Sequence, residues 1–134
     1  MFARLGPPVI GDLIERISNA IVHQEGEPIV ALNPGNLRGA PWLTAPVIRG
    51  GFWVPPSREA GLAGIAHVVA LRIAMGQSLT QLISAWAPAS DHNNTAAYIA
   101  NVKEWAAIPD ENAPLWDFVE APAGARGIPP APPA

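Results

Sequence analysis

Residues 12–26 read DLIERISNAIVHQEG, and this stretch determines how the fold begins. Its apolar side chains recur at the three- and four-residue spacing that places them on one face of an amphipathic helix. Asp12, followed three residues later by Glu15, predicts a capped start, and Gly26 stands where a helix C-cap belongs. The stretch therefore predicts a helix over residues 12–25 with one side packed into a core.

The pattern changes after this helix. Residues 27–56 are rich in Pro, Gly and Asn and carry only short apolar pieces. Such composition predicts irregular backbone, with at most a small β-hairpin across residues 47–48 and 52–54.

Three more helices and a short last turn are predicted downstream. A second helix begins at Ser57 and ends before Gly76. Its apolar residues nearly encircle it, which favours a central, buried helix with His67 in the core. A third, short helix follows Ser78 or Thr80 and stops before residue 88, a proline.

Residues 87–93 are expected to form a polar loop. Asn94 or Thr95 then caps a fourth helix, and a turn or short helix around residues 114–119 closes the fold. The fold class is therefore mainly α, with a small loop and β-hairpin region between the first two long helices.

Composition limits the possible functions. The 134 residues fit one domain over residues 1–120, followed by a Pro/Ala-rich tail at 121–134 that we expect to be flexible. The chain has no cysteine, and the charge of −3 includes no basic block for nucleic acid. The histidines are too scattered for a metal site, and no cofactor motif is present. We expect a monomer without a signal peptide or membrane insertion, made in the cytosol.

Glu25 is the residue that best fits a chemical role. It ends the first helix, where the negative pole of the helix dipole opposes an ionised carboxylate. A group that must carry a proton to a substrate benefits from such an environment. The alternative is a solvated glutamate at a frayed helix end.

A resemblance adds to this interpretation. The string His23-Gln24-Glu25-Gly26, then Asn33-Pro34-Gly35-Asn36-Leu37-Arg38, and later Asn93-Asn94-Thr95-Ala96-Ala97-Tyr98, resembles a family of phage and prophage lysozyme-like proteins. The layout is also similar to flagellar-type glucosaminidases, and the Thr-x-x-Tyr piece to lytic transglycosylases and goose-type lysozymes. The resemblance implies a lysozyme-like domain that cleaves peptidoglycan glycan strands, acting at the cell wall after release during host lysis or as a virion component.

The resemblance also implies roles for individual residues. Glu25 would protonate the glycosidic oxygen between N-acetylmuramic acid and N-acetylglucosamine. Tyr98 would point its hydroxyl toward the acid or the substrate, or else be a core tyrosine with a satisfied hydroxyl. Thr95 would line the cleft, or else cap the fourth helix.

Other polar and aromatic residues are candidates for binding sugar. Asn33, Asn36 and Arg38 could bind hydroxyl and acetamido groups, although both asparagines could instead stabilise turns beside Pro and Gly. Among the aromatic residues, Trp42 is the candidate for stacking on a pyranose ring.

The second carboxylate of a glycosidase is left open. The candidates are Glu27, Glu59, Asp91 and Asp110, and Asp91 is favoured as a site residue because it lies beside the Asn-Asn-Thr string. A hydrolase needs two carboxylates, whereas a lytic transglycosylase needs one because the muramic acid's own 6-hydroxyl closes the ring. Both remain possible at this point, as does a binding protein of the same fold without turnover.

Overall fold

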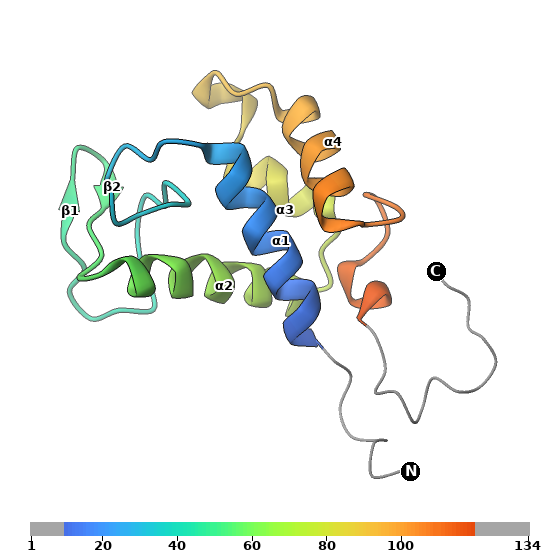
Figure 1. Ribbon diagram of the computed structural model, residues 1–134, viewed down its shortest axis with the longest axis horizontal. Helices are drawn as coiled ribbons and strands as arrows, with labels where there is room; N and C mark the ends of the chain where they lie inside the picture. Colours follow the sequence, from blue (N-terminus) through green and yellow to red (C-terminus); the bar gives the residue numbers. More distant parts are fainter. Residues whose placement is uncertain (1–9, 120–134) are drawn as a thin grey trace, which may run out of the picture.

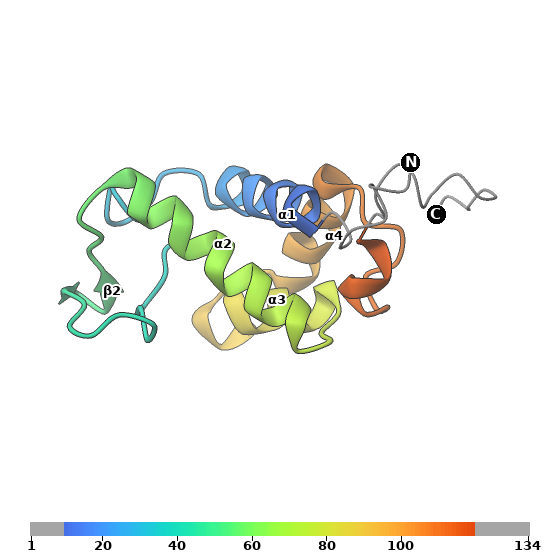
Figure 2. The ribbon, with the colours of Figure 1, turned by 90° about the horizontal axis from the view of Figure 1, so that it is seen from below.

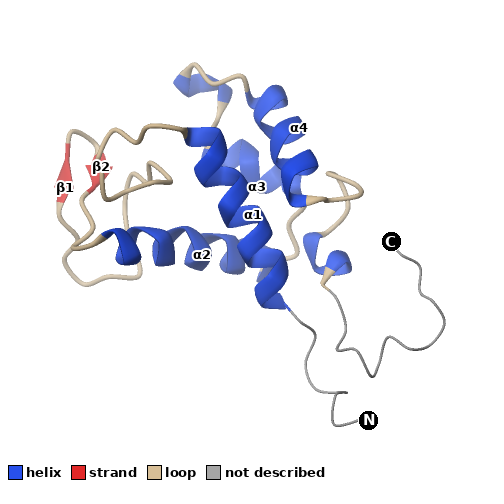
Figure 3. Cartoon of the chain, viewed as in Figure 1, coloured by secondary structure: helices blue, strands red, loops and turns tan. Residues whose placement is uncertain are grey.

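The computed structural model describes residues 10–119 as a mainly helical fold with one small sheet (Figures 1 and 3). The tail at 121–134 and the first residues of the chain lie outside the described part. The elements, in chain order, are α1 (Ile10–Glu25), β1 (Ile48–Arg49), β2 (Phe52–Trp53), α2 (Arg58–Ala74), α3 (Leu79–Trp86), η2 (Ala89–Asp91), α4 (Thr95–Ala106) and η3 (Leu115–Phe118). This confirms the mainly α class and the small hairpin between the first two long helices.

Helix α1 lies at the centre of the fold and packs against both α4 and α2 (Figure 1). Its buried side chains are Leu13, Ile17, Ala20 and Ile21. It runs antiparallel to α4: Arg16 in its first half donates a hydrogen bond to the carbonyl of Ala106, the last residue of α4. The C-terminal end of α1 therefore lies beside the N-terminal half of α4.

Of the two predicted ends of α1, only the C-terminal one agrees with the structure. Ile10 and Gly11 belong to the helix, so the prediction that Asp12 caps it is wrong. Asp12 instead pairs with Arg16 one turn later, at 3.0 Å. Gly26 adopts φ +67° and its N–H bonds to the carbonyl of Val22, which confirms the predicted C-cap.

The second helix differs from its predicted role. Its inner face is buried through Ile65, Val69 and Ile73, whereas Leu71 is half exposed and His67 is exposed. The prediction of a central helix with His67 in the core is therefore wrong. Apolar residues all round a helix do not show on which sides neighbours pack, and the outer side of α2 borders a cavity instead.

The segment between α1 and α2 forms one end of the molecule, away from α4 and η3 (Figure 2). Its hairpin pairs Ile48 with Trp53 across a turn at Gly50 and Gly51, both with positive φ. The segment lies close against α2 because that helix has glycines there. A Cβ at Gly64 would stand 2.7 Å from the Trp53 ring.

The remaining helix starts follow the sequence closely. Ser57 accepts from Ala60 N–H and Ser78 forms a capping box with Gln81, as predicted for the second and third helices. The α4 cap is Asn94, which leaves Thr95 inside the first turn. The predicted polar loop at 87–93 contains the short η2 turn, and η3 confirms the predicted last short helix.

Candidate active site

Glu25, Asn36 and Tyr98 meet at the end of α1. Asn36 Nδ2 donates to Glu25 Oε1 at 2.6 Å, and the Tyr98 hydroxyl donates to Glu25 Oε2 at 2.6 Å. The three residues come from a helix end, a loop and the first turn of another helix. Charge-assisted bonds of this length are strong, so the two donors fix the orientation of the half-buried carboxyl group.

The Asn36 amide has a fixed orientation. Its Oδ1 accepts from the N–H of Ile29 at 2.9 Å, so its Nδ2 must face Glu25. The residue adopts φ +50° at the end of a turn in which its own N–H bonds to the carbonyl of Asn33 at 3.0 Å. Asparagine is one of the few residues that tolerate this left-handed backbone. Asn36 is therefore both a turn residue and a donor to the candidate acid.

Tyr98 is buried, and its hydroxyl is a permanent neutral partner of Glu25. Burial, followed by the negative charge of Glu25 and the hydrogen bond to it, raises the pKa of Tyr98 far above its ordinary value. The phenol therefore keeps its proton at any pH at which the fold is stable. Tyr98 is also a core tyrosine whose hydroxyl is satisfied by Glu25, so the two roles predicted for it coincide.

Asn33 has a different role from the predicted one. It is fully buried. Its Nδ2 donates to the carbonyls of Leu37 and Trp53 at 2.8 and 2.9 Å, and its Oδ1 accepts from Leu37 N–H at 2.9 Å. With its amide saturated and no exposed surface, it cannot contact a ligand. The prediction of a sugar-binding Asn33 is wrong, and the residue instead ties the Asn36 turn to the hairpin.

A small polar cavity of about 190 Å³ opens beside Glu25. Arg38 and Asp91, both predicted site residues, line it and pair with each other at 3.6 Å. The Arg38 guanidinium also lies 4.6 Å from the centre of the Phe52 ring. Among residues 10–119, Asp91 is thus the only other carboxylate at this cavity, while Glu27, Glu59 and Asp110 do not line it.

Two other predicted site residues lie away from this cavity. Thr95 does not line it, and its hydroxyl donates to the carbonyl of Ala87 at 2.7 Å, which ties the start of α4 to the end of α3. This corrects the prediction of a cleft-lining Thr95. Trp42 lines a larger neighbouring cavity, where it packs on Trp53 and His67 with ring centres 5.6 and 4.6 Å apart.

The sequence favoured a core role for two aromatic residues that the fold places beside Glu25. Phe52 and Trp86 both line the small cavity. The Trp86 indole N–H donates to the carbonyl of Gly35 at 3.1 Å, which joins α3 to the Asn36 turn. The last turn of a short helix before a proline could have marked Trp86, but the helical pattern assigned it to the core.

Within residues 10–119, no group of His, Asp and Glu side chains is arranged to hold a metal ion. None of the helices described there has the length and apolar character needed to cross a bilayer. No protein-family model, curated protein or solved structure matches this chain. Support for a function therefore comes from the geometry around Glu25 and from the sequence motifs.

Proposed function

We propose that this protein is a lysozyme-like glycosidase that cleaves the β-1,4 bond between N-acetylmuramic acid and N-acetylglucosamine in peptidoglycan. Glu25 is the general acid. The observation that carries the proposal is the carboxyl group of Glu25, held between Asn36 and Tyr98 at the edge of a cavity. These residues come from the same motifs that resemble phage and prophage lysozyme-like proteins.

The two partners of Glu25 support proton transfer in different ways. The Asn36 amide can only donate to Oε1, because its own oxygen faces Ile29 N–H. The Tyr98 hydroxyl can donate to an ionised carboxylate or accept from a protonated one. Glu25 can therefore gain or lose a proton at Oε2 while its neighbours stay in place, as a group that protonates a leaving oxygen requires.

A lytic transglycosylase is the second candidate, because Asp91 is the one other carboxylate within residues 10–119 that lines the cavity of Glu25. A hydrolase would have to use it as nucleophile or base, yet it is an exposed side chain held only by a long, 3.6 Å pair with Arg38. A transglycosylase needs no second protein carboxylate, because the 6-hydroxyl of the muramic acid attacks the anomeric carbon. The same acid, Glu25, would serve both reactions.

The test is the digestion of purified peptidoglycan by the wild type and by Glu25→Gln, followed by mass spectrometry of the released fragments. The wild type should release soluble fragments, and Glu25→Gln should lose at least about a hundredfold in rate with a nearly unchanged melting temperature. Reducing muramic acid ends indicate a hydrolase, and 1,6-anhydro ends a transglycosylase. Binding of the wild type without any release, or full activity of Glu25→Gln, would contradict the proposal.

A further inference from the structure

A second, larger cavity adjoins the one at Glu25. Its volume is about 550 Å³, within the usual range of small-molecule sites. The two cavities share part of their lining, namely Asn36, Arg38, Trp86 and Asp91, and so lie side by side. A ligand that passes these side chains would occupy both.

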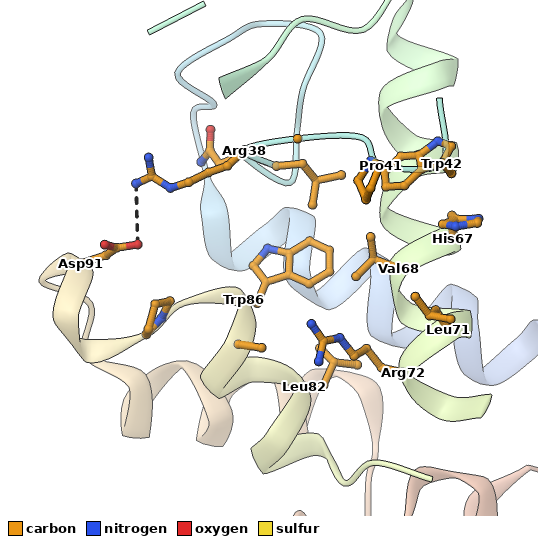
Figure 4. Close-up of a pocket in the computed structure, with 15 residues that line it drawn as sticks. Arg38, Pro41, Trp42, His67, Val68, Leu71, Arg72, Leu82, Trp86 and Asp91 are labelled. Atoms are coloured by element: carbon orange, nitrogen blue, oxygen red, sulfur yellow. Dashed lines mark ion pairs between the residues drawn. The ribbon is translucent and has the colours of Figure 1, made fainter. Parts of the chain in front are cut away.

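The walls of the larger cavity are mainly apolar. Figure 4 shows Trp86 from α3 facing Val68 and Leu71 from α2, with Pro41 and Trp42 from the loop beside that helix. Leu71 is half exposed. A water-filled space with such walls favours a ligand with an apolar body.

Arg72 brings a positive charge into this apolar space. Its guanidinium points from α2 toward Trp86 (Figure 4). Within residues 10–119 its side chain makes one hydrogen bond, to Gln77 Oε1 at 3.3 Å, and no salt bridge. Of the carboxylates in the described residues, Asp91 alone lines the cavity, and it faces Arg38 instead. Most donors of Arg72 are therefore open to a carboxylate brought by a ligand.

We propose that the larger cavity is a subsite for the acidic stem peptide that branches from the muramic acid of peptidoglycan. This inference rests on the proposed function and extends it to the choice of substrate. The stem peptide combines small apolar side chains with free carboxylates, which matches the apolar walls and Arg72. It also leaves the glycan at a sugar next to the bond to be cleaved, which matches the position of this cavity beside the one at Glu25.

Direct binding of the free peptide tests the subsite without any cleavage. A soluble stem tetrapeptide (L-alanyl-γ-D-glutamyl-diaminopimelyl-D-alanine) is titrated into the full chain, with calorimetry and tryptophan fluorescence as readouts, since Trp42 and Trp86 line the cavity. Wild-type protein should bind it saturably. Arg72→Met and the peptide with its carboxylates amidated should each weaken Kd by about tenfold or more, as expected for one charge-assisted hydrogen bond.

Arg58→Met is the matched control. It removes the same charge from the same helix, 14 positions away and so about 21 Å along the axis, and Arg58 does not line the cavity. It should keep the wild-type Kd. No saturable binding by the wild type, or equal binding of the amidated peptide, would overturn the subsite. If Arg72→Met does not fold, the comparison of the two peptides on the wild type decides.

Cleavage then separates the two proposals. Strands that carry stem peptides should be cleaved with a kcat/KM about tenfold above strands stripped by an amidase, and Arg72→Met should lower this ratio toward one. Equal cleavage of both substrates by the wild type contradicts the proposed subsite but agrees with the proposed glycosidase activity. Failure to cleave either substrate contradicts the glycosidase, whereas the peptide titration still reports on the cavity.

Discussion

The substitution Asn33→Ala should destabilise the fold strongly, although the residue lies in a loop. It removes three hydrogen bonds, a buried one to the Trp53 carbonyl and two partly buried ones to the N–H and the carbonyl of Leu37. The Leu37 carbonyl keeps a bond from Trp53 N–H, but the Leu37 N–H and the Trp53 carbonyl lose the amide partner. At about 1 kcal/mol for each bond, the free energy of unfolding should fall by about 3 kcal/mol. For a domain of this size the melting temperature should fall by roughly 12 °C.

Urea and thermal unfolding measure this loss. Asn93→Ala is the matched control, because that exposed side chain makes one hydrogen bond, to the carbonyl of Pro88 at 3.1 Å, and should cost less than about 1 kcal/mol. A change for Asn33→Ala no larger than for Asn93→Ala would refute the claim that Asn33 holds the loop in place. The Asn36 turn would then need another support.

Three further predictions concern the candidate active site and the packing of the helices and loops around it. Tyr98 is the single tyrosine of the chain, and burial raises its pKa, so tyrosinate absorbance should appear only on unfolding. The wild type should lose stability as pH rises above about 10, with a slope that Tyr98→Phe lacks; parallel slopes would contradict this. Gly61→Ala places a Cβ 2.0 Å from the Leu32 carbonyl oxygen and should cost about 2 kcal/mol or more in urea unfolding. Gly11→Ala meets nothing within 4 Å and should be neutral or stabilising; equal losses would argue against the close packing. Asn36→Gly keeps the left-handed backbone and removes the donor to Glu25, so peptidoglycan cleavage should slow about tenfold; an unchanged rate would exclude positioning by this amide.

Local signals in the sequence predicted the helices well because each signal acts over one turn. Ser57 and Ser78 cap helices where they were expected to, since a side-chain oxygen needs only the backbone three residues later. Gly26 ends α1 for a similarly local reason. Asp12 is not the cap because α1 begins two residues earlier, at Ile10, which places Asp12 inside the first turn.

The sequence identified most residues of the candidate site, but it did not predict the role of each one. Asn33 and Asn36 look equivalent in the string Asn-Pro-Gly-Asn, yet one is fully buried and the other contacts Glu25. Their difference depends on the hairpin that packs over Asn33, and the hairpin partner, Trp53, lies 20 positions later in the chain. Spacing within a loop does not carry that information.

The sequence by itself determined where most of the helices start and stop, that Glu25 ends the first of them, and that no thiol chemistry is possible. Only the tertiary structure decided that Tyr98, 73 positions away, donates to that carboxyl group, and that Arg72 shares an apolar cavity with Trp42 and Trp86. The physical reason is the separation in sequence of the groups that interact. Helix caps and helical periodicity involve residues a few positions apart, whereas burial and ion pairing depend on which distant segments pack together.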